Sequence, residues 1–396
     1  MIAPTSFFSD YGCSVRILEE TRILQSHRHN VTICTYRNGQ DLPGIPIVRT
    51  ASIPFREHYE VGSSLHKVAF DFLLFWTVLY RAIRRRPDVI HAHMHEGALI
   101  GLVASGLLRI PMIFDFQGSM TSEMLDHKFL TKGSPFYRLL RWLEERVDRR
   151  ARVILTSSEN ARRLLIEEFD CRPERVLPLV DCVDAEQFRP ALESEKEELA
   201  ARRASLRIPD GRKIVVYLGL LAPYQGTDAL LQAAEGIVRE RQDVHFLIMG
   251  FPSVDHYRAV ARGRGLAAHT TFTGKIPYHQ ARDYLALGDV AVAPKLSATE
   301  GSGKILNYMA MGLPTVTFDT PVSREYLGDK GIYARAGDAE SLAQALLRTL
   351  AMEPDRARAL SRELRQAAIE DYSWERAVHT IRLAYKTACQ APSNVL

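Results

Sequence analysis

The chain has 396 residues and a formal charge of +4, with 46% hydrophobic and 25% charged residues. This length suits two domains of ordinary size, each able to bury its own core, and the composition is that of a globular protein. So small a charge argues against a nucleic-acid-binding protein, which needs a strong basic field. We therefore expect no nucleic acid among the partners.

The five cysteines are scattered along the chain, and no Cys-x-x-Cys pair occurs. This arrangement argues against a disulfide framework or a zinc site and favours a reducing compartment. The first residues, MIAPTSFF, lack the basic segment of a secretory signal. We therefore expect a cytoplasmic protein.

Short apolar segments alternate with helical segments through the first half of the chain. Strands are expected at residues 1–8, 30–36, 45–50, 88–93, 111–116, 153–157 and 175–179. Helices are expected at residues 15–24, 66–85, 97–108, 136–150 and 159–168. Strands and helices that alternate at this spacing form βαβ units around a parallel sheet.

The alternation breaks at residues 181–190 and restarts after the highly charged residues 193–207, which are expected to form a solvated helix. This region is interpreted as a connection between domains. In the second half, strands are expected at residues 213–218, 244–249, 270–273, 289–293, 315–318 and 331–333. Helices are expected at residues 227–240, 257–265, 278–287, 304–311 and 341–351, with two closing helices in 356–390. The sequence thus predicts an α/β protein with two doubly wound parallel-sheet domains.

Residues 68–80, VAFDFLLFWTVLY, form the most membrane-like segment, but they are too few to span a bilayer and include Asp71. Arg81 and a run of arginines at 84–86 follow. Two interpretations stay open. A core helix packed on the sheet is favoured, and the alternative is an amphipathic helix in peripheral contact with the inner face of a membrane.

The stretch 294–314, PKLSATEGSGKILNYMAMGLP, predicts a strand end, a glycine-rich loop and a helix that starts near Lys304. Small residues before a helix expose free N–H groups at the positive end of its dipole, which suits an anion such as a diphosphate. Lys304 would add a point charge there. An ordinary strand-to-helix turn has the same pattern, so this stretch alone leaves both interpretations open.

Other expected strands also end in glycine and polar residues, at 10–12, 93–97, 117–119, 219–226 and 250–252. Ligands bind at such strand ends in doubly wound folds. The three histidines of HAHMH stand at alternate positions and so share one strand face, a poor geometry for a tetrahedral metal. With no Asp-x-Asp motif in the sequence either, we expect no bound metal.

Several of these segments together resemble the retaining nucleotide-sugar glycosyltransferases of the GT-B fold, family 4. The resemblance covers nearly the whole chain and is carried by YLGLLAPYQG, FTGKIPY, EGSGKILNYMAMGLP, VLPLVDCVDAEQFRP and YSW. It implies two Rossmann-like domains that face a central cleft, at residues 1–185 and 186–375. It also implies that a last helix, within 376–396, returns to the first domain.

The resemblance implies transfer of a hexose from a UDP- or GDP-sugar to a hydroxyl of a glycan, polysaccharide or lipid-linked acceptor, with retention and without metal or cofactor. The second domain would bind the donor through Gly219, Gln225, Gly250, Lys275, Ile276, Glu300, Gly301, Ser302, Gly303, Lys304, Ile305 and Asn307. The first domain would bind the acceptor through Gly12, His93 and Glu96. The candidates for catalysis are Lys304, Gln117 and His95.

The chain departs from the family pattern at its charged positions. The family's two glutamates, eight residues apart, align with Thr299 and Asn307, and Glu300 lies one residue away from the first. A neutral amide at Asn307 can still bind a ribose hydroxyl.

An arginine and a lysine of the family's glycine loop correspond here to Leu220 and Gln225. Two charge-assisted contacts to a diphosphate are therefore missing, which leaves Lys304 as the leading cation and Lys275 and Lys295 as reserves. Two alternatives stay open for this reason. They are a catalytically impaired scaffold that binds a nucleotide sugar, and a nucleotide-sugar epimerase on the same fold.

Overall fold

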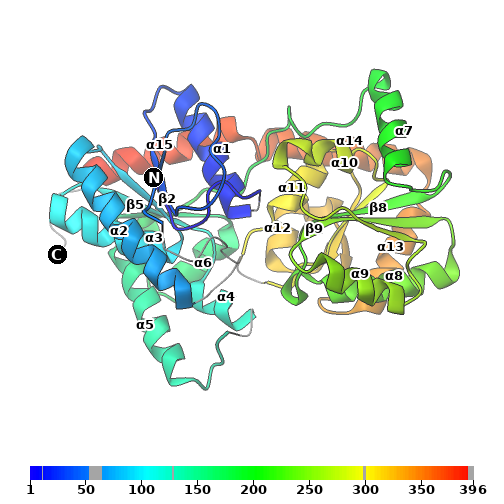
Figure 1. Cartoon of the computed structure of the whole chain (residues 1–396), viewed down its shortest axis with the longest axis horizontal. Coiled ribbons are helices and arrows are strands. Elements are labelled where there is room, and N and C mark those ends of the chain that lie inside the picture. Colours follow the sequence, from blue (N-terminus) through cyan, green and yellow to red (C-terminus); the bar gives the residue numbers. More distant parts are fainter. Residues whose placement is uncertain (11, 53–64, 127–128, 298–299, 391–396) are drawn as a thin grey trace. The chain divides into compact units, whose positions relative to one another are not determined.

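The structure is a computed structural model, and it describes residues 1–10, 12–52, 65–126, 129–297 and 300–390 (Figure 1). The chain divides into two compact units. The first contains Met1–Asp181, a short piece of the loop before Ser302 and the segment from Trp374 onward. The second contains the chain from Cys182 to Ser373, except for a short piece of the loop before Ser302.

Within the described residues, the first unit is built on a seven-stranded parallel sheet with the order β3-β2-β1-β4-β5-β6-β7. The strands are β1 (Ile2–Ala3), β2 (Ile33–Thr35), β3 (Ile47–Arg49), β4 (Ile90–His93), β5 (Met112–Phe116), β6 (Val153–Thr156) and β7 (Val176–Pro178). The strand expected over residues 1–8 is much shorter in the structure. Pro4 follows β1 directly and lacks the N–H that a strand inside a sheet needs.

Helices cover both faces of this sheet. One face shares a single apolar core with α2 (Leu65–Arg85), α3 (Met94–Leu108), α5 (Pro135–Arg150) and α6 (Glu159–Glu167). The helices α1 (Gly12–Ser26) and α15 (Trp374–Gln390) pack on each other, and α15 also contacts β5, β6 and β7. Side chains of a strand alternate between the two faces, so Ile90 and Ala92 enter the apolar core while His91 and His93 face α1.

The second unit has a six-stranded parallel sheet, again within the described residues, with the order β10-β9-β8-β11-β12-β13. The strands are β8 (Lys213–Leu220), β9 (Val244–Phe251), β10 (Thr270–Phe272), β11 (Val290–Ala293), β12 (Thr315–Phe318) and β13 (Ile332–Ala334). The helices are α7 (Lys196–Ser205), α8 (Thr227–Glu240), α9 (Val254–Gly263), α10 (Ala281–Leu285), α11 (Gly303–Ala310), α12 (Pro321–Leu327), α13 (Ala339–Leu350) and α14 (Pro354–Asp371). The sheet and its helices enclose a second apolar core.

The expected elements are present with bounds shifted by a few residues, and two short helices were not expected from the sequence. They are α4 (Met120–Asp126) and α12. The start of α12 is encoded locally, because Thr320 accepts a hydrogen bond from the Ser323 N–H and Pro321 occupies the first turn. Helix α15 belongs to the first unit although it follows the second in sequence, as the resemblance implied. None of the described helices is both long and apolar enough to span a bilayer.

Candidate active site

The glycine-rich loop of the second unit leads from β11 into α11, as the sequence predicted. The apolar side of α11 is buried in the unit, including Ile305, so this residue can offer a ligand only its backbone. Ser302 precedes the helix, and its Oγ is buried without a hydrogen-bond partner among the described residues. The first N–H groups of a helix have no partner within it, so this end of α11 presents donors and a positive dipole end.

Lys304, in the first turn of α11, lies among polar groups of two other segments. Its Nζ donates a hydrogen bond of 3.0 Å to Gln225 Oε1 and lies 3.5 Å from Tyr217 Oη. The ammonium also lies over the Tyr217 ring, 4.6 Å from the ring centroid. An ammonium has three donors, so Lys304 can bind Gln225 and an anionic ligand at the same time.

Tyr217 and Gln225 are both buried, which gives the ammonium a fixed surrounding. Burial raises the pKa of Tyr217, so its hydroxyl stays protonated and donates to the Leu220 carbonyl oxygen at 2.6 Å. A lone pair of that hydroxyl remains to accept from Lys304. Gln225 stands in a 3-10 turn, Pro223–Gln225, immediately before α8.

Two glycines at the ends of β8 and β9 allow this close arrangement. Gly219 has φ +147°, and a Cβ there would lie 2.5 Å from Lys304 Nζ. A Cβ on Gly250 would lie 2.2 Å from the Gly219 carbonyl oxygen. Side chains at either position would therefore collide with the strand end or with the lysine.

The remaining donor candidates lie around the same strand ends of the second unit or in the loop before α11. Glu300 and Gly301 belong to that loop, Gly303 is the exposed first residue of α11, and Asn307 follows Lys304 by one turn. Lys275 is exposed, with its Nζ 5.3 Å from the centroid of the Phe251 ring, and Ile276 beside it is buried. Lys295, the other reserve, is half-buried after β11.

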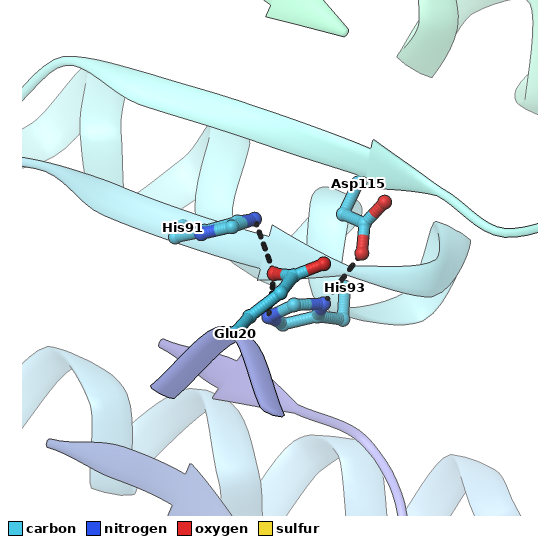
Figure 2. Close-up of side chains that lie close together, drawn as sticks. All are labelled: Glu20, His91, His93 and Asp115. Atoms are coloured by element: carbon cyan, nitrogen blue, oxygen red, sulfur yellow. Dashed lines mark hydrogen bonds and ion pairs between the residues drawn. The ribbon is translucent and has the colours of Figure 1, made fainter. Parts of the chain in front are cut away.

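A buried polar cluster lies in the first unit, between the sheet and α1 (Figure 2). It joins His91 and His93 of β4, Asp115 of β5 and Glu20 of α1. The Arg16 guanidinium donates two hydrogen bonds to the carboxylate of Asp115, from Nε to Oδ2 and from Nη2 to Oδ1, both of 2.9 Å. Arg16 Nε also lies 3.0 Å from Glu20 Oε1.

The protonation states of the residues in this cluster follow from the charges around them. Burial opposes a charge on Asp115, but Arg16 and His93 outweigh it and hold the pKa of Asp115 far below its usual range. Asp115 is therefore an acceptor only, and the proton of the 2.9 Å bond between His93 Nδ1 and Asp115 Oδ2 belongs to His93.

Burial also raises the pKa of Glu20, to which the charge of Asp115 adds, and burial lowers the pKa of His91 and His93. The cluster thus has one guanidinium and one firmly ionised carboxylate. Glu20 Oε2 lies 3.6 Å from His91 Nε2 and 3.9 Å from His93 Nε2.

Gln117 lies at the end of β5, next to this cluster and half-buried. Its Nε2 donates to Asp115 Oδ2 at 3.2 Å, so the amide orientation is fixed by the cluster. His93 is fully buried beneath it, which favours a role in positioning Gln117 over the direct acceptor contact predicted from the sequence. This hydrogen bond engages the amide nitrogen of Gln117.

His95 is placed on the other face of the sheet. Its Nε2 lies 3.2 Å from Asp148 Oδ1 and 3.6 Å from Glu144 Oε1, both of α5. Burial opposes the charged ring, but the carboxylates of Asp148, Glu144 and Glu96 outweigh it and raise the pKa of His95 to about 9. Glu144 in turn accepts a hydrogen bond of 2.7 Å from Ser119 Oγ. This placement favours support of the loop after Gln117 over the catalytic role predicted from the sequence.

The two remaining acceptor candidates lie at helix starts. Glu96 is in the first turn of α3 and forms an ion pair with Lys67 of α2, which outweighs burial and lowers the pKa of Glu96. Gly12 is the exposed first residue of α1, and a Cβ there would meet no atom within 4 Å. A ligand can therefore approach the backbone at Gly12.

Sequence reasoning missed Arg16 and Glu20. Both occur in VRILEETRIL, a helix in which residues on every side are buried. A signal was present in the sequence, because charges four residues apart on a largely apolar helix indicate a buried ion pair. Their partner Asp115 is distant in sequence, so it could not be identified.

Two clusters of described residues contain enough ligand atoms for a metal ion: Glu20, His91, His93 and Asp115, and separately His95, Glu144 and Asp148. In the first, the His91 and His93 rings stack at 4.4 Å with 21° between their planes, so their lone pairs run side by side. Asp115 is moreover already bound by Arg16. Both clusters are better described as hydrogen-bonded and ion-paired networks.

Comparison with known proteins agrees with this architecture. Residues 11–179 match the family model described as glycosyl transferase 4-like domain, and residues 212–352 match that of the glycosyl transferases group 1. The first match contains the described strands of the first sheet except β1, and the second contains strands β8 to β13 and helices α8 to α13.

Similar proteins are known from bacteria. The D-inositol 3-phosphate glycosyltransferase of Geodermatophilus obscurus is 25% identical over an alignment of 408 residues, gaps included. The alignment covers 96% of this chain and 85% of that protein. The phosphatidyl-myo-inositol mannosyltransferase of Mycobacterium leprae is 25% identical over an alignment of 400 residues, gaps included. That alignment covers 100% of this chain and 98% of that protein.

Among solved structures, Anabaena Alr3699/HepE in complex with UDP and glucose has the same fold, with a TM-score of 0.75, 15% identity and 98% of each chain covered. With two parallel-sheet domains of the GT-B type and both family models matched in chain order, the chain belongs to the glycosyltransferases, as a member with a 4-like and a group 1 domain.

Proposed function

We propose that the enzyme transfers a sugar from a nucleotide-diphosphate sugar to an acceptor hydroxyl, with retention of configuration and without a metal. One observation carries the proposal: Lys304 lies at the N-terminus of α11 with its ammonium oriented by Gln225 and Tyr217. The UDP found with Alr3699/HepE supports a nucleotide donor.

The N-terminus of α11 is suited to stabilise a departing diphosphate. Negative charge that develops on the leaving oxygen is stabilised by donors that are already in position, here the Lys304 ammonium, the helix N–H groups and the Ser302 hydroxyl. Gln225 stands where the resemblance led us to expect a cation, and it orients Lys304 through Oε1. Its Nε2 carries two further donors for a phosphate oxygen.

In this mechanism the acceptor hydroxyl attacks the face from which the diphosphate leaves, and its proton passes to the leaving diphosphate. No protein nucleophile is required. Gln117 would accept a hydrogen bond from a sugar or acceptor hydroxyl through its Oε1, because its Nε2 is held by Asp115. Asp115, His93 and Arg16 act on the reaction only through Gln117.

We propose that the acceptor is a hydroxyl of a glycan, a polysaccharide or a lipid-linked molecule. Both curated relatives carry inositol in their names, one as a phosphate and the other as a phosphatidyl lipid. A polyhydroxylated ring suits the Gln117 amide and the accessible backbone at Gly12. We propose that the reaction needs no cofactor, because the nucleotide sugar is itself a substrate.

The first prediction concerns Lys304. UDP, GDP or one of their sugar conjugates at millimolar concentration should raise the melting temperature of the protein, and Lys304→Ala should remove most of this shift. Lys196→Ala is the matched control, because Lys196 is an exposed lysine of the same unit, paired only locally with Glu193. Thermal unfolding with and without each nucleotide measures the effect.

Absence of any nucleotide-dependent shift in the wild-type protein would contradict the proposal. A shift without transfer of labelled sugar to glycan, inositol or lipid acceptors would instead favour the scaffold alternative. Release of an epimerised sugar from the donor would favour the epimerase.

A further inference from the structure

Helix α2 is apolar on two opposite sides. One side, with Phe70, Leu74 and Val78, is buried in the core of the first unit. The other side carries large apolar side chains that are 53–69% exposed: Val68, Phe72, Trp76, Tyr80 and Ile83. Their spacing of three and four residues places them on one stripe of the helix. Packing on the sheet requires only the first side, and the second side stays exposed among the residues that the structure describes.

The neighbouring helices carry the same kind of stripe. Leu99, Val103 and Leu107 are exposed on α3, and Phe136, Leu139 and Trp142 are exposed on α5. Helices α2, α3 and α5 lie in this order along one face of the sheet, each in contact with the next (Figure 1). The three stripes therefore share the outer side of one helix layer, and we call these eleven side chains the outer apolar face.

The exposed charges on the three helices themselves have one sign. Among the residues of these three helices whose side chains the structure describes, every exposed charged one is an arginine: Arg84, Arg85, Arg138, Arg146, Arg149 and Arg150. The acidic residues of the helices are buried or half-buried. Asp71 accepts a hydrogen bond from Tyr36, Glu96 pairs with Lys67, and Glu145 pairs with Arg141.

Most of these arginines gather at one end of the layer. The three helices each return from the carboxyl end of one parallel strand to the start of the next, so they run in the same direction. Their last turns, with Arg84 and Arg85 in α2 and Arg149 and Arg150 in α5, therefore lie along the same edge. Exposed Arg109 follows α3 at that edge. Gln117 lies at the opposite edge, where the strands end.

We propose that the outer apolar face rests in the interface of an anionic lipid bilayer, with the arginine edge against lipid phosphates. Exposed apolar area of this extent marks an interaction surface, and an arginine-rich border matches a negatively charged membrane. Tryptophan and tyrosine with arginine beside them suit the headgroup level. Arg84 lies 5.2 Å from the centroid of the Tyr80 ring, and Arg146 lies 5.1 Å from that of Trp142.

A lipid surface fits better than a protein partner. The face extends across three parallel helices, and a protein partner would have to supply acidic groups along the whole arginine edge. The proposal does not depend on the donor chemistry, so its test can fail while the proposed function holds.

Flotation of the full chain with vesicles tests the proposal. The protein should float with vesicles of equal parts phosphatidylcholine and phosphatidylglycerol, and hardly at all with phosphatidylcholine alone. Replacing both Phe72 and Trp76 by serine should reduce the floated fraction about tenfold. Leu383→Ser is the matched control, because Leu383 is also exposed in the first unit but lies on α15, which packs with α1. It should float like the wild-type protein.

Tryptophan fluorescence gives an independent measurement. The chain has three tryptophans: Trp76 and Trp142 on the outer apolar face, and Trp374, which is buried. Brominated lipids in the anionic vesicles should quench the wild-type emission, and replacing Trp76 and Trp142 by phenylalanine should remove the quenching. An unchanged melting temperature and nucleotide response would show that the variants remain folded.

Three results would overturn the proposal. They are no flotation of the wild-type protein with anionic vesicles, equal flotation of the Phe72 and Trp76 double variant, and flotation without quenching. Self-association that the double variant abolishes, without any lipid binding, would assign the face to contact between copies of the chain.

Discussion

Lys304 shows how a single residue depends on its immediate neighbours. Its ammonium is oriented by an amide, by a phenol and by the absence of a side chain at Gly219. The charge that we propose binds a diphosphate is thus concentrated on one group, and its position is controlled by neutral ones. Small changes around it should therefore be felt at the ligand.

Gly219→Ala tests this dependence. The alanine must adopt φ +147°, and its Cβ would stand 2.5 Å from Lys304 Nζ, so the ammonium has to move. We expect a loss of about 1 kcal/mol in the free energy of unfolding and a clearly weaker stabilisation by UDP or GDP. Urea unfolding and nucleotide-dependent melting measure the two effects.

Gly263→Ala is a suitable control for this substitution. Gly263 lies in α9, and a Cβ there meets nothing within 4 Å, so the change should leave the nucleotide response intact. A Gly219→Ala protein with a full nucleotide response would show that the position of the ammonium is not critical.

The raised pKa of His95 predicts how the free energy of unfolding depends on pH. Its pKa is raised from 6.5 in the unfolded chain to about 9 in the folded protein, so folding favours the protonated ring. The stabilisation is complete below pH 6.5 and is lost as the pH rises toward 9. Relative to His95→Asn, the wild-type protein should lose on the order of 2 kcal/mol of unfolding free energy across this range.

The comparison of the two unfolding profiles isolates His95 from other groups that titrate in the same range. If the free energy of unfolding changed with pH in the same way in both proteins, the His95 ring would be neutral in the folded protein. The ion pair with Asp148 would then have to be replaced by a neutral hydrogen bond.

At the scale of elements, α15 acts as a cover for the polar cluster of the first unit. The Tyr385 hydroxyl lies 3.0 Å from His91 Nδ1, and the helix contacts three strands of the sheet. Burial raises the pKa of Tyr385, so its hydroxyl stays protonated. A helix that follows the second unit in sequence thus completes the core of the first.

Tyr385→Phe should measure this contribution. Removal of the hydroxyl leaves His91 Nδ1 without its partner, at an expected cost of about 1 kcal/mol in the free energy of unfolding. Chemical unfolding followed by far-UV circular dichroism detects the loss. Lys386→Ala, at the exposed neighbouring position, should leave stability unchanged, and equal stability of both variants would contradict the assignment.

Elements with a clear period were predictable from sequence, and contacts between distant residues were not. The alternation in DVIHAH and PMIFDF indicated strands, and the loop of small residues indicated the start of α11. The pairing of Arg16 with Asp115 spans 99 residues, and the bond from Lys304 to Gln225 spans 79. Local propensity carries no information on such pairs.

His95 illustrates the same limit. The alternation in HAHMH predicts one strand face for His91, His93 and His95, but β4 ends at His93. His95 lies in α3, which turns it toward the carboxylates of α5. The amphipathic helix at residues 66–85 was expected to be either a core helix or an interfacial one. The structure shows a helix with one buried and one exposed apolar side. The buried side agrees with the core-helix interpretation, and contact of the other side with a membrane stays a proposal.

On the scale of the whole molecule, the second unit interrupts the first. Residues 182–373 form a compact body of their own, whereas the first unit needs the segment from Trp374 to cover its polar cluster. During synthesis the ribosome therefore makes every strand of the first sheet early but supplies its final helix only after the whole second unit. Until then the face that α15 will cover stays accessible to water and to chaperones, and the second unit is able to fold before the first is finished.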